Sequence, residues 1–258
     1  KYEPRDGWKG YVYSEILDKD GKVITNPAWN GKNTAEKLDA RKANYDSRLI
    51  LSWKSEDNLL PSRTLDQAKG EPIVFNFENL SATQKGWLNK NALDATDTKG
   101  SDRDKFIRGD TSNEGDAAPN FRKRTSIQGD IINSAIWYTS WPNSALAFKG
   151  YSDFAKTYDF RTPMLYVGGN DGMLHGFSAI DGEEKIAYIP RGAIPKLRYL
   201  ADQGYNDKHK FFVDGSPMTG DVDVANTPNN NDKQTHTPNW RTLLVGSMGL
   251  GGKGYFIL

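Results

Sequence analysis

Short apolar runs separated by tight-turn residues constrain the fold of this chain more than any other feature of its sequence. Leu165–Phe177 is such a run, interrupted by the turn residues Asn170–Gly172, and Asp181–Gly182 separates it from a further apolar stretch at residues 185–189. Asn-Gly and Asp-Gly pairs favour the two-residue turns that join neighbouring antiparallel strands. This segment is therefore predicted to form one antiparallel sheet.

The same order of strand, turn and strand recurs in the chain. Leu244–Gly246 and Gly254–Leu258 flank a glycine-rich link, and a fainter copy comprises Gly10–Tyr13, Ile16–Leu17 and Lys22–Ile24. Repeated short sheets are typical of a β-propeller, in which each sheet packs against the next and few strand edges are exposed. We predict an all-β fold, a partial β-propeller with long loop insertions and a few short helices. An open β-sandwich whose hairpins resemble one another by chance is the alternative.

The segments between these strands differ in character. Asn33 and Ser81 are each followed three residues later by Glu or Gln, the capping-box pattern of a helix start, so a short helix is expected after each. Strands are expected at about 48–53, 72–77 and within 127–137, a polar surface excursion at 94–120, and irregular structure at 142–160. We predict a single domain over residues 1–258, with insertions at about 33–45, 81–120, 190–210 and 225–239.

Composition excludes several classes of function. The 34 basic and 33 acidic residues leave a net charge of +1, which gives no field to gather nucleic acid or anionic lipid. From this charge balance we expect no nucleic-acid partner. The absence of cysteine removes disulfides, thiolate metal sites and cysteine nucleophiles. No apolar run approaches the roughly 20 residues of a membrane helix, so we also expect no membrane insertion by this segment. Because the chain begins at Lys1 and stops within a predicted strand, we expect a fragment of a longer protein.

Motifs that would indicate an enzyme lack the context that their chemistry needs. Gly249–Gly254 matches the letters of the dinucleotide fingerprint, but that loop opens a helix, and the residues after Gly254 are typical of a strand. Ser216 lacks the glycine-flanked turn of a hydrolase nucleophile. His175, His209 and His236 are too far apart in sequence for a zinc motif, and His175 is expected to pack within a strand. We assign no catalytic, cofactor or metal residue and predict that the chain is not an enzyme.

One oxygen-rich stretch is a candidate for calcium binding. Asp221, Asp223, Asn226, Asn229 and Asp232 supply the ligand type that a hard cation prefers. The stretch lacks a glycine at the sixth position, and an alanine stands where a ligand is needed. A loop without calcium is therefore the favoured interpretation.

Arg108, Gly109 and Asp110 form the tripeptide that integrins recognise, a guanidinium and a carboxylate separated by a flexible glycine. A three-residue match is a weak signal. The other interpretation is structural, because Arg108 and Asp110 can anchor their own loop through charge-assisted hydrogen bonds. We favour loop anchoring and keep integrin recognition as the alternative.

A set of longer sequence blocks spans nearly the whole chain. They are Phe106–Asp110 with Asn113 and Glu114, Phe121–Arg124, Gly129–Ser134, Tyr166–Phe177, Phe212–Pro217 with Gly220 and Asp221, and Trp240–Gly246 through Gly251–Gly254, with weaker matches at Trp8–Gly10, Trp29 and Asn79–Gln84. In this order they resemble the C-terminal β-propeller region of the PilC/PilY family of type IV pilus biogenesis factors and tip-associated adhesins.

The resemblance implies that residues 1–258 are the N-terminal part of a C-terminal propeller of the modified quinoprotein-dehydrogenase-like type. It also implies a location at the cell surface, at the pilus tip or in the outer membrane and periplasm of a Gram-negative bacterium. It implies a non-enzymatic role in pilus assembly against retraction and in attachment to host cells. The implied partners are pilin or minor pilin subunits and a host-cell surface receptor such as an integrin.

The resemblance also bears on cofactors. Relatives of this fold that oxidise alcohols need a bound quinone and calcium, but this chain has no adjacent-cysteine pair and no recognisable ligand set. The family's regulatory calcium loop is not recognisable here, so calcium is expected, if at all, elsewhere in the full-length protein. A quinone-dependent dehydrogenase-like propeller and a purely structural spacer are the alternative functions.

Overall fold

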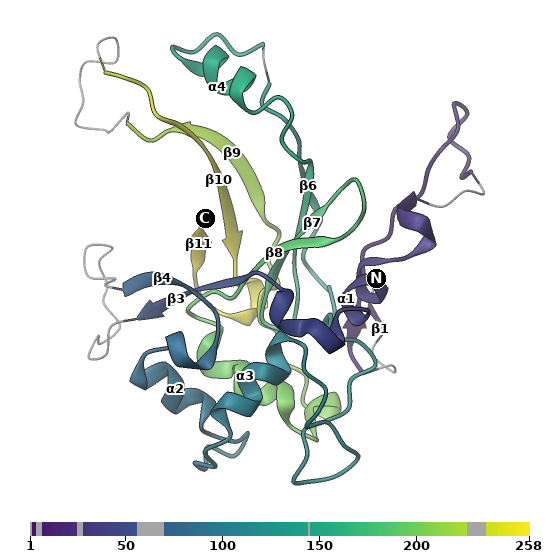
Figure 1. Cartoon of the computed structure of the whole chain (residues 1–258), viewed down its shortest axis with the longest axis vertical. Helices are drawn as coiled ribbons and strands as arrows, with labels where there is room; N and C mark the ends of the chain where they lie inside the picture. Colours follow the sequence, from purple (N-terminus) through teal and green to yellow (C-terminus); the bar gives the residue numbers. More distant parts are fainter. Residues whose placement is uncertain (1, 4–6, 25–27, 56–69, 144, 226–235) are drawn as a thin grey trace.

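A six-stranded sheet and a three-stranded sheet form the body of the molecule, with a separate pair of short strands near the N-terminus (Figure 1). The computed structural model describes residues 2–3, 7–24, 28–55, 70–143, 145–225 and 236–258. Its strands are β1 (Tyr2–Glu3), β2 (Lys9–Gly10), β3 (Ile50–Ser55), β4 (Gly70–Val74), β5 (Trp137–Thr139), β6 (Met164–Gly168), β7 (Leu174–Ser178), β8 (Glu184–Tyr188), β9 (Met218–Asp223), β10 (Trp240–Ser247) and β11 (Tyr255–Ile257). The α-helices are α1 (Thr34–Asp39), α2 (Ala82–Leu88), α3 (Gly100–Arg108) and α4 (Tyr151–Thr157), and the 3-10 helices are η2 (Ala28–Gly31), η3 (Lys42–Ser47), η5 (Phe77–Asn79), η6 (Ile194–Ala201), η7 (Tyr205–Asp207) and η8 (Gly249–Gly251).

Four consecutive strands, β5 to β8, form the antiparallel sheet that the turn residues predict. They are neighbours in the six-stranded sheet, whose order is β4-β3-β8-β7-β6-β5. Val167 on β6 lies opposite His175 on β7. The turn between these strands contains Gly172 at φ 98°, and the next turn contains Gly182 at φ 72°, both in the left-handed region that favours glycine. The predicted blade is confirmed.

The strand β3 extends this blade in a way that the sequence does not indicate. It pairs in parallel with β8, with Ile50 opposite Ala187 and Leu51 opposite Tyr188. On its other side β3 pairs antiparallel with β4. The two strands expected near residues 48–53 and 72–77 are therefore present, but they continue an existing sheet.

The strands β9, β10 and β11 form the second antiparallel sheet and confirm the strand pair expected near the end of the sequence. Gly246 on β10 lies opposite Phe256 on β11. The link between them holds η8, and the described residues after Gly254 form a strand, so the dinucleotide-binding interpretation fails on local structure. The two sheets are separate, and the structure is an open, partial propeller.

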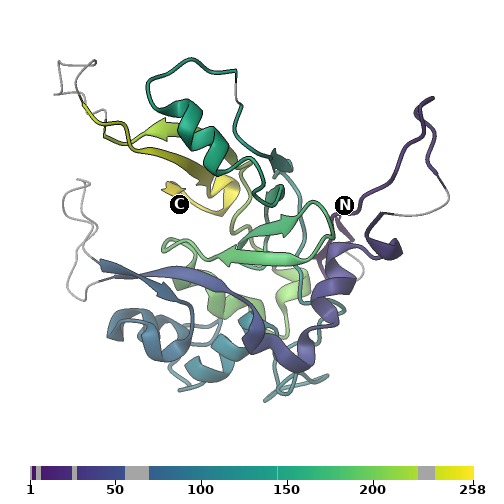
Figure 2. The ribbon, with the colours of Figure 1, turned by 45° about the horizontal axis from the view of Figure 1, so that its top comes forward.

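A helical layer lies against the β3–β4 end of the six-stranded sheet (Figures 1 and 2). It consists of α2, α3 and η6, which contact one another. The largest apolar core lies here: Leu88, Phe106, Ile194 and Leu197 are each at most 2% exposed. Two of the predicted insertions, 81–120 and 190–210, thus pack against each other and both contribute side chains to this apolar core.

The expectation of a polar surface excursion at residues 94–120 is wrong for the middle of this range, whereas residues 94–98 and 111–120 are mostly exposed. The helix α3 lies in this range and buries Phe106 and Ile107. Its Arg103 is also buried, because Nη1 donates to the Asp97 carboxylate at 2.7 Å and to the Leu88 carbonyl at 2.9 Å. A paired charge costs far less to bury than a free one, so a segment rich in charge still packs as a core helix.

Both predicted helix starts are confirmed. The Asn33 side chain accepts the Glu36 amide at 3.0 Å, and the Glu36 carboxylate accepts the Asn33 amide at 2.8 Å. Ser81 and Gln84 make the same reciprocal pair at the start of α2. Each box satisfies two amides that would otherwise lack partners at the helix N-terminus.

Most of residues 127–137 do not form the expected strand, because β5 begins only at Trp137. Side chains from distant loops take the place of a neighbouring strand in this stretch. The Gly129 amide donates to the Asp171 carboxylate at 2.8 Å, and the Asn133 amide donates to Asp214 at 3.3 Å.

The faint N-terminal copy of the repeat does not form a blade. Lys9–Gly10 pairs with Tyr2–Glu3, and Lys9 also makes an isolated bridge to Gly129. Leu17 and Val23 make another isolated bridge. Residues 151–157, expected to be irregular, form α4, and residues 226–235 of the insertion at 225–239 lie outside the described part of the chain. Within that part, no helix has the length and apolar character needed to cross a membrane.

Candidate functional site

Arg108, the first residue of the integrin-type tripeptide, ends α3 and is held by two carboxylates. Its Nη1 bonds to Asp46, and its Nη2 lies 3.1 Å from Asp104 Oδ2. The Tyr45 ring lies 5.1 Å from the guanidinium, and the Arg108 side chain is 15% exposed. Burial lowers the pKa of Arg108, but Asp104 and Asp46 outweigh it and raise the pKa above its ordinary value. The guanidinium is thus an anchored and permanently charged group.

Gly109 and Asp110 form the turn after α3. Gly109 ends the helix at φ 123°, and the Asp110 amide donates to the Lys105 carbonyl at 2.9 Å. The Asp110 carboxylate accepts the amide and the hydroxyl of Ser112, both at 2.9 Å, and the Asp110 carbonyl accepts Arg124 Nη2 at 3.0 Å. These contacts favour loop anchoring over integrin recognition, and both roles stay predictions.

A buried cluster of four charged side chains lies within the blade, and sequence reasoning missed it. Glu184 on β8 accepts Arg48 Nε at 2.8 Å, Arg48 Nη2 at 2.9 Å and His175 Nδ1 at 2.8 Å. His175 Nε2 lies 3.0 Å from Asp171 Oδ2. The side chains of Arg48, His175 and Glu184 are at most 1% exposed, and that of Asp171 is 12% exposed. We call these four residues the buried charge cluster.

Mutual pairing keeps the members of the buried charge cluster ionised. Burial raises the pKa of Glu184, but Arg48 and His175 outweigh it and hold the pKa well below its usual range. Burial lowers the pKa of His175, but Asp171 and Glu184 outweigh it and raise the pKa to about 9. Within these four residues two cations and two anions balance, and such pairing offsets the cost of burying charge. The partly exposed Arg41 lies 4.0 Å from Glu184 Oε2 at the edge of the cluster.

The buried charge cluster joins segments that are far apart in the sequence. Arg48 precedes β3, Asp171 lies in the turn before β7, and the other two members lie on β7 and β8. Asp171 also holds the Gly129 amide. Because three of its four side chains are at most 1% exposed, we interpret the cluster as a structural element that holds the sheet together. Arg48 and Glu184 are 136 residues apart, so no local pattern could have paired them.

The other residues considered for catalysis have structural partners as well. His209 Nε2 lies 2.9 Å from Asp130, and His236 Nε2 lies 2.5 Å from Asp223. The Ser216 hydroxyl accepts a backbone amide at 2.9 Å. None of these contacts joins a nucleophile to a histidine.

The oxygen-rich stretch considered for calcium does not converge on one point where it is described. Asp221 accepts the Tyr151 hydroxyl at 2.6 Å, whereas Asp223 bonds to His236 and to backbone amides. The remaining candidates lie outside the described residues: Asn226, Asn229 and Asp232. Within the described ranges, no group of three or more His, Asp or Glu side chains could hold a metal ion. Calcium elsewhere in a longer protein stays a prediction.

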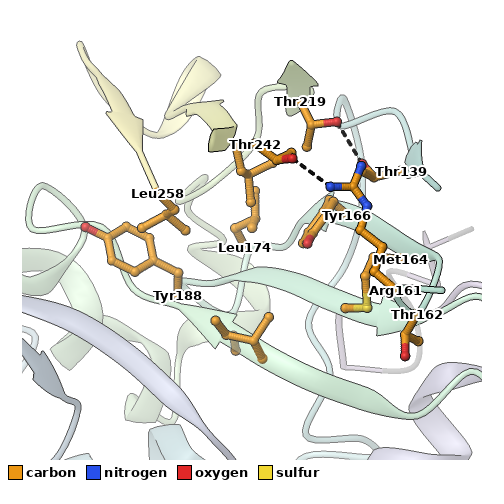
Figure 3. A pocket seen from close by; sticks show the side chains of 13 residues that line it. Thr139, Arg161, Thr162, Met164, Tyr166, Leu174, Tyr188, Thr219, Thr242 and Leu258 are labelled. Carbon is orange, nitrogen blue, oxygen red and sulfur yellow. Dashed lines mark hydrogen bonds between the residues drawn. The ribbon is translucent and has the colours of Figure 1, made fainter. Parts of the chain in front are cut away.

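A cavity of about 250 Å³ lies between the two sheets (Figure 3). Tyr166 and Leu174 line it from the six-stranded sheet, and Thr242 and Leu244 line it from the three-stranded sheet. Arg161, which precedes β6, supplies a guanidinium to the wall. Consecutive sheets of a propeller pack face to face, and this cavity is a gap in that packing.

Comparison with known proteins identifies the family. The family model of the PilY1 beta-propeller domain matches residues 128–258. The chain is 42% identical over 194 residues to the type IV pilus biogenesis factor PilY1 of Pseudomonas aeruginosa strain PAK, a match that covers 71% of this chain and 15% of that protein. It is 36% identical over 195 residues to a PilY1 homolog of Xylella fastidiosa, covering 73% of this chain and 15% of that protein.

A solved structure gives a further match. The crystal structure of the Pseudomonas aeruginosa PilY1 C-terminal domain is 34% identical, covers 48% of this chain and 22% of that chain, and has a TM-score of 0.31. The chain spans about 15% of the length of the two curated relatives. From the family match and these identities, the chain belongs to the PilY1 family of type IV pilus biogenesis factors, and residues 128–258 are part of its β-propeller domain.

Proposed function

We propose that this chain is a non-enzymatic module of a type IV pilus biogenesis factor that acts through protein–protein contacts. It supports pilus assembly against retraction and mediates attachment to host cells. Its partners are pilin or minor pilin subunits and a host-cell surface receptor, and it works at the cell surface, at the pilus tip or the outer membrane. The observation that carries the proposal is the 42% identity to PilY1 over 194 residues.

The surface of the chain supports a contact role. Trp141, Phe148 and Phe160 are large aromatic side chains with 57%, 59% and 93% exposure. Aromatic residues are enriched where proteins meet, and loops on a rigid scaffold commonly carry binding residues. The buried charge cluster supports the proposal of a non-enzymatic role, because its histidine and carboxylates pair with other side chains and hold the sheet together.

Counting surface pili tests the role in assembly. The codons for these 258 residues are removed in frame from the chromosome, once in a strain with an active retraction motor and once in a strain without it. We expect few pili in the first strain and normal numbers in the second, because the module opposes retraction. Normal pili in both strains would leave the module as a structural spacer and contradict the proposal.

A conservative substitution separates the two roles of the tripeptide. Asp110→Glu is compared with Asp116→Glu, whose side chain is 84% exposed, in host-cell adhesion and in thermal unfolding. Lost adhesion with an unchanged melting temperature supports receptor recognition through Asp110. A lowered melting temperature supports loop anchoring. Deletion of residues 94–120 is no substitute, because α3 belongs to the core.

A further inference from the structure

The cavity between the two sheets has a polar end and an apolar end. Figure 3 shows Arg161, Thr139 and Thr242 gathered at one end and Leu258 and Tyr188 at the other. The volume of about 250 Å³ exceeds the roughly 150 Å³ of an apolar protein cavity that accepts benzene. The space is therefore large enough for a small organic molecule with two chemically different ends.

The cation at the polar end lacks a direct counter-ion. Arg161 Nε donates to the Ser140 carbonyl at 2.6 Å, and Nη1 donates to Thr242 Oγ1 at 2.6 Å. Among the described residues, Arg161 makes no ion pair with a carboxylate, and its Nη2 has no hydrogen-bond partner. Arg161 is linked to the Asp221 carboxylate through the Thr242 hydroxyl, which donates to Asp221 at 2.5 Å. The other oxygen of Asp221 already accepts the Tyr151 hydroxyl.

Two fixed contacts orient the Arg161 guanidinium while leaving its Nη2 edge open. Arginine presents its N–H groups as a planar fork that matches a carboxylate. The Tyr166 hydroxyl lines the same cavity and has no hydrogen-bond partner among the described residues. Burial raises the pKa of Tyr166, although Arg161 opposes the shift, so this hydroxyl is a donor at neutral pH. The polar end thus offers donors to an anion.

The rest of the cavity is apolar. Leu174, Ile186, Leu244 and Leu258 line it, and Leu174 and Leu244 belong to a small apolar core shared by the two sheets. An alkyl group placed here would leave water and gain contacts on both walls.

We propose that this cavity binds a small aliphatic carboxylate, with the carboxylate on the Arg161 Nη2 edge and the alkyl chain between Leu174, Leu244 and Leu258. This goes beyond the contact role proposed above and does not depend on it. A carboxylate replaces the missing counter-ion, and a charge-assisted pair in a partly dry site contributes more than the same pair on an open surface.

Titration with matched probes tests the proposal. Sodium hexanoate, hexan-1-ol and hexylamine are each titrated into the 258-residue chain at pH 7, followed by calorimetry and by NMR chemical shifts. We expect saturable binding of hexanoate, with shifts of the Leu174 and Leu244 methyl groups, and binding of hexan-1-ol weaker by about tenfold or more. Equal affinity for hexanoate and hexan-1-ol, or no saturation by hexanoate up to about 10 mM, would overturn the proposal.

Three variants assign the binding to this cavity. Arg161→Gln should weaken hexanoate binding by about tenfold and leave hexan-1-ol binding unchanged. Arg241→Gln removes one cation from an exposed position on β10 and should change neither. Leu258→Trp fills the apolar end without touching Arg161 and should abolish hexanoate binding, so the test still decides if Arg161→Gln fails to fold. Unchanged hexanoate affinity in a folded Leu258→Trp chain would exclude this cavity as the site.

Discussion

Glu184→Gln is expected to destabilise the chain strongly, because the carboxylate holds two buried cations at once. Its Oε2 accepts Arg48 Nε at 2.8 Å, and its Oε1 accepts Arg48 Nη2 and His175 Nδ1. An amide group in place of either oxygen sets N–H against N–H and leaves Arg48 short of its counter-charge. Removing one partner of a buried ion pair costs about 3–5 kcal/mol, a large part of the roughly 5–15 kcal/mol that a domain has.

The matched control is Glu71→Gln. Glu71 pairs with Lys54 at 2.9 Å, but the two side chains are 62% and 42% exposed. Such a surface pair contributes at most about 1 kcal/mol. The two variants therefore remove the same charge and keep the same shape in different surroundings.

Thermal unfolding by circular dichroism measures the difference. At roughly 2–4 °C per kcal/mol for a chain of this size, Glu184→Gln should lower the melting temperature by about 6–20 °C and Glu71→Gln by no more than about 4 °C. Urea titration at 25 °C gives the same comparison in free energy of unfolding. Equal effects of the two substitutions would refute the view that the buried charge cluster holds the blade together.

Three further results are expected. The pKa of His175 is about 9 in the folded chain and about 6.5 in the unfolded chain. Its contribution to stability is therefore complete below about pH 6.5 and disappears as the pH rises through about 9. Urea midpoints measured from pH 6 to 10 would show this loss, and a flat profile would contradict it. Gly168→Ala places Cβ 2.3 Å from the Val213 carbonyl oxygen and should lower the free energy of unfolding by about 1–3 kcal/mol. In the control Gly220→Ala, the added Cβ meets nothing within 4 Å, and the same urea assay should show a change within about 0.5 kcal/mol. Asn33→Ala removes the cap of α1 and should cost about 1 kcal/mol of unfolding free energy; no loss would show that tertiary contacts alone hold the helix.

Local patterns predicted the parts of this fold that local chemistry determines. The turn glycines Gly172 and Gly182 place the β6–β7 and β7–β8 turns, because few other residues accept their backbone angles. The capping boxes at Asn33 and Ser81 fix two helix starts for a similar reason. In each case the interacting residues lie within a few positions of one another.

Long-range packing decided what local patterns missed. The helix α3 appears polar, yet Arg103 is buried because Asp97 pairs with it. The strand β3 joins β8 in parallel from more than a hundred residues away. Arg48 reaches Glu184 over a similar separation. Nothing in the neighbouring sequence of these residues carries that information.

The candidate tripeptide was visible in the sequence, but its environment was not. Arg108 is recognisable by its neighbours Gly109 and Asp110, whereas its partners Asp46 and Asp104 are known only from the fold. The cavity beside Arg161 was not predicted, because its two walls come from different sheets.

Cross-linking within intact pili tests most directly whether this chain works by contact with pilus subunits. Pili sheared from piliated cells are treated with an amine-reactive cross-linker, and the linked peptides are identified by mass spectrometry. We predict links between exposed lysines of this chain, such as Lys123 and Lys156, and pilin or minor pilin subunits. Abundant pilin–pilin links with none to this chain, although its peptides are detected in the sample, would contradict the account.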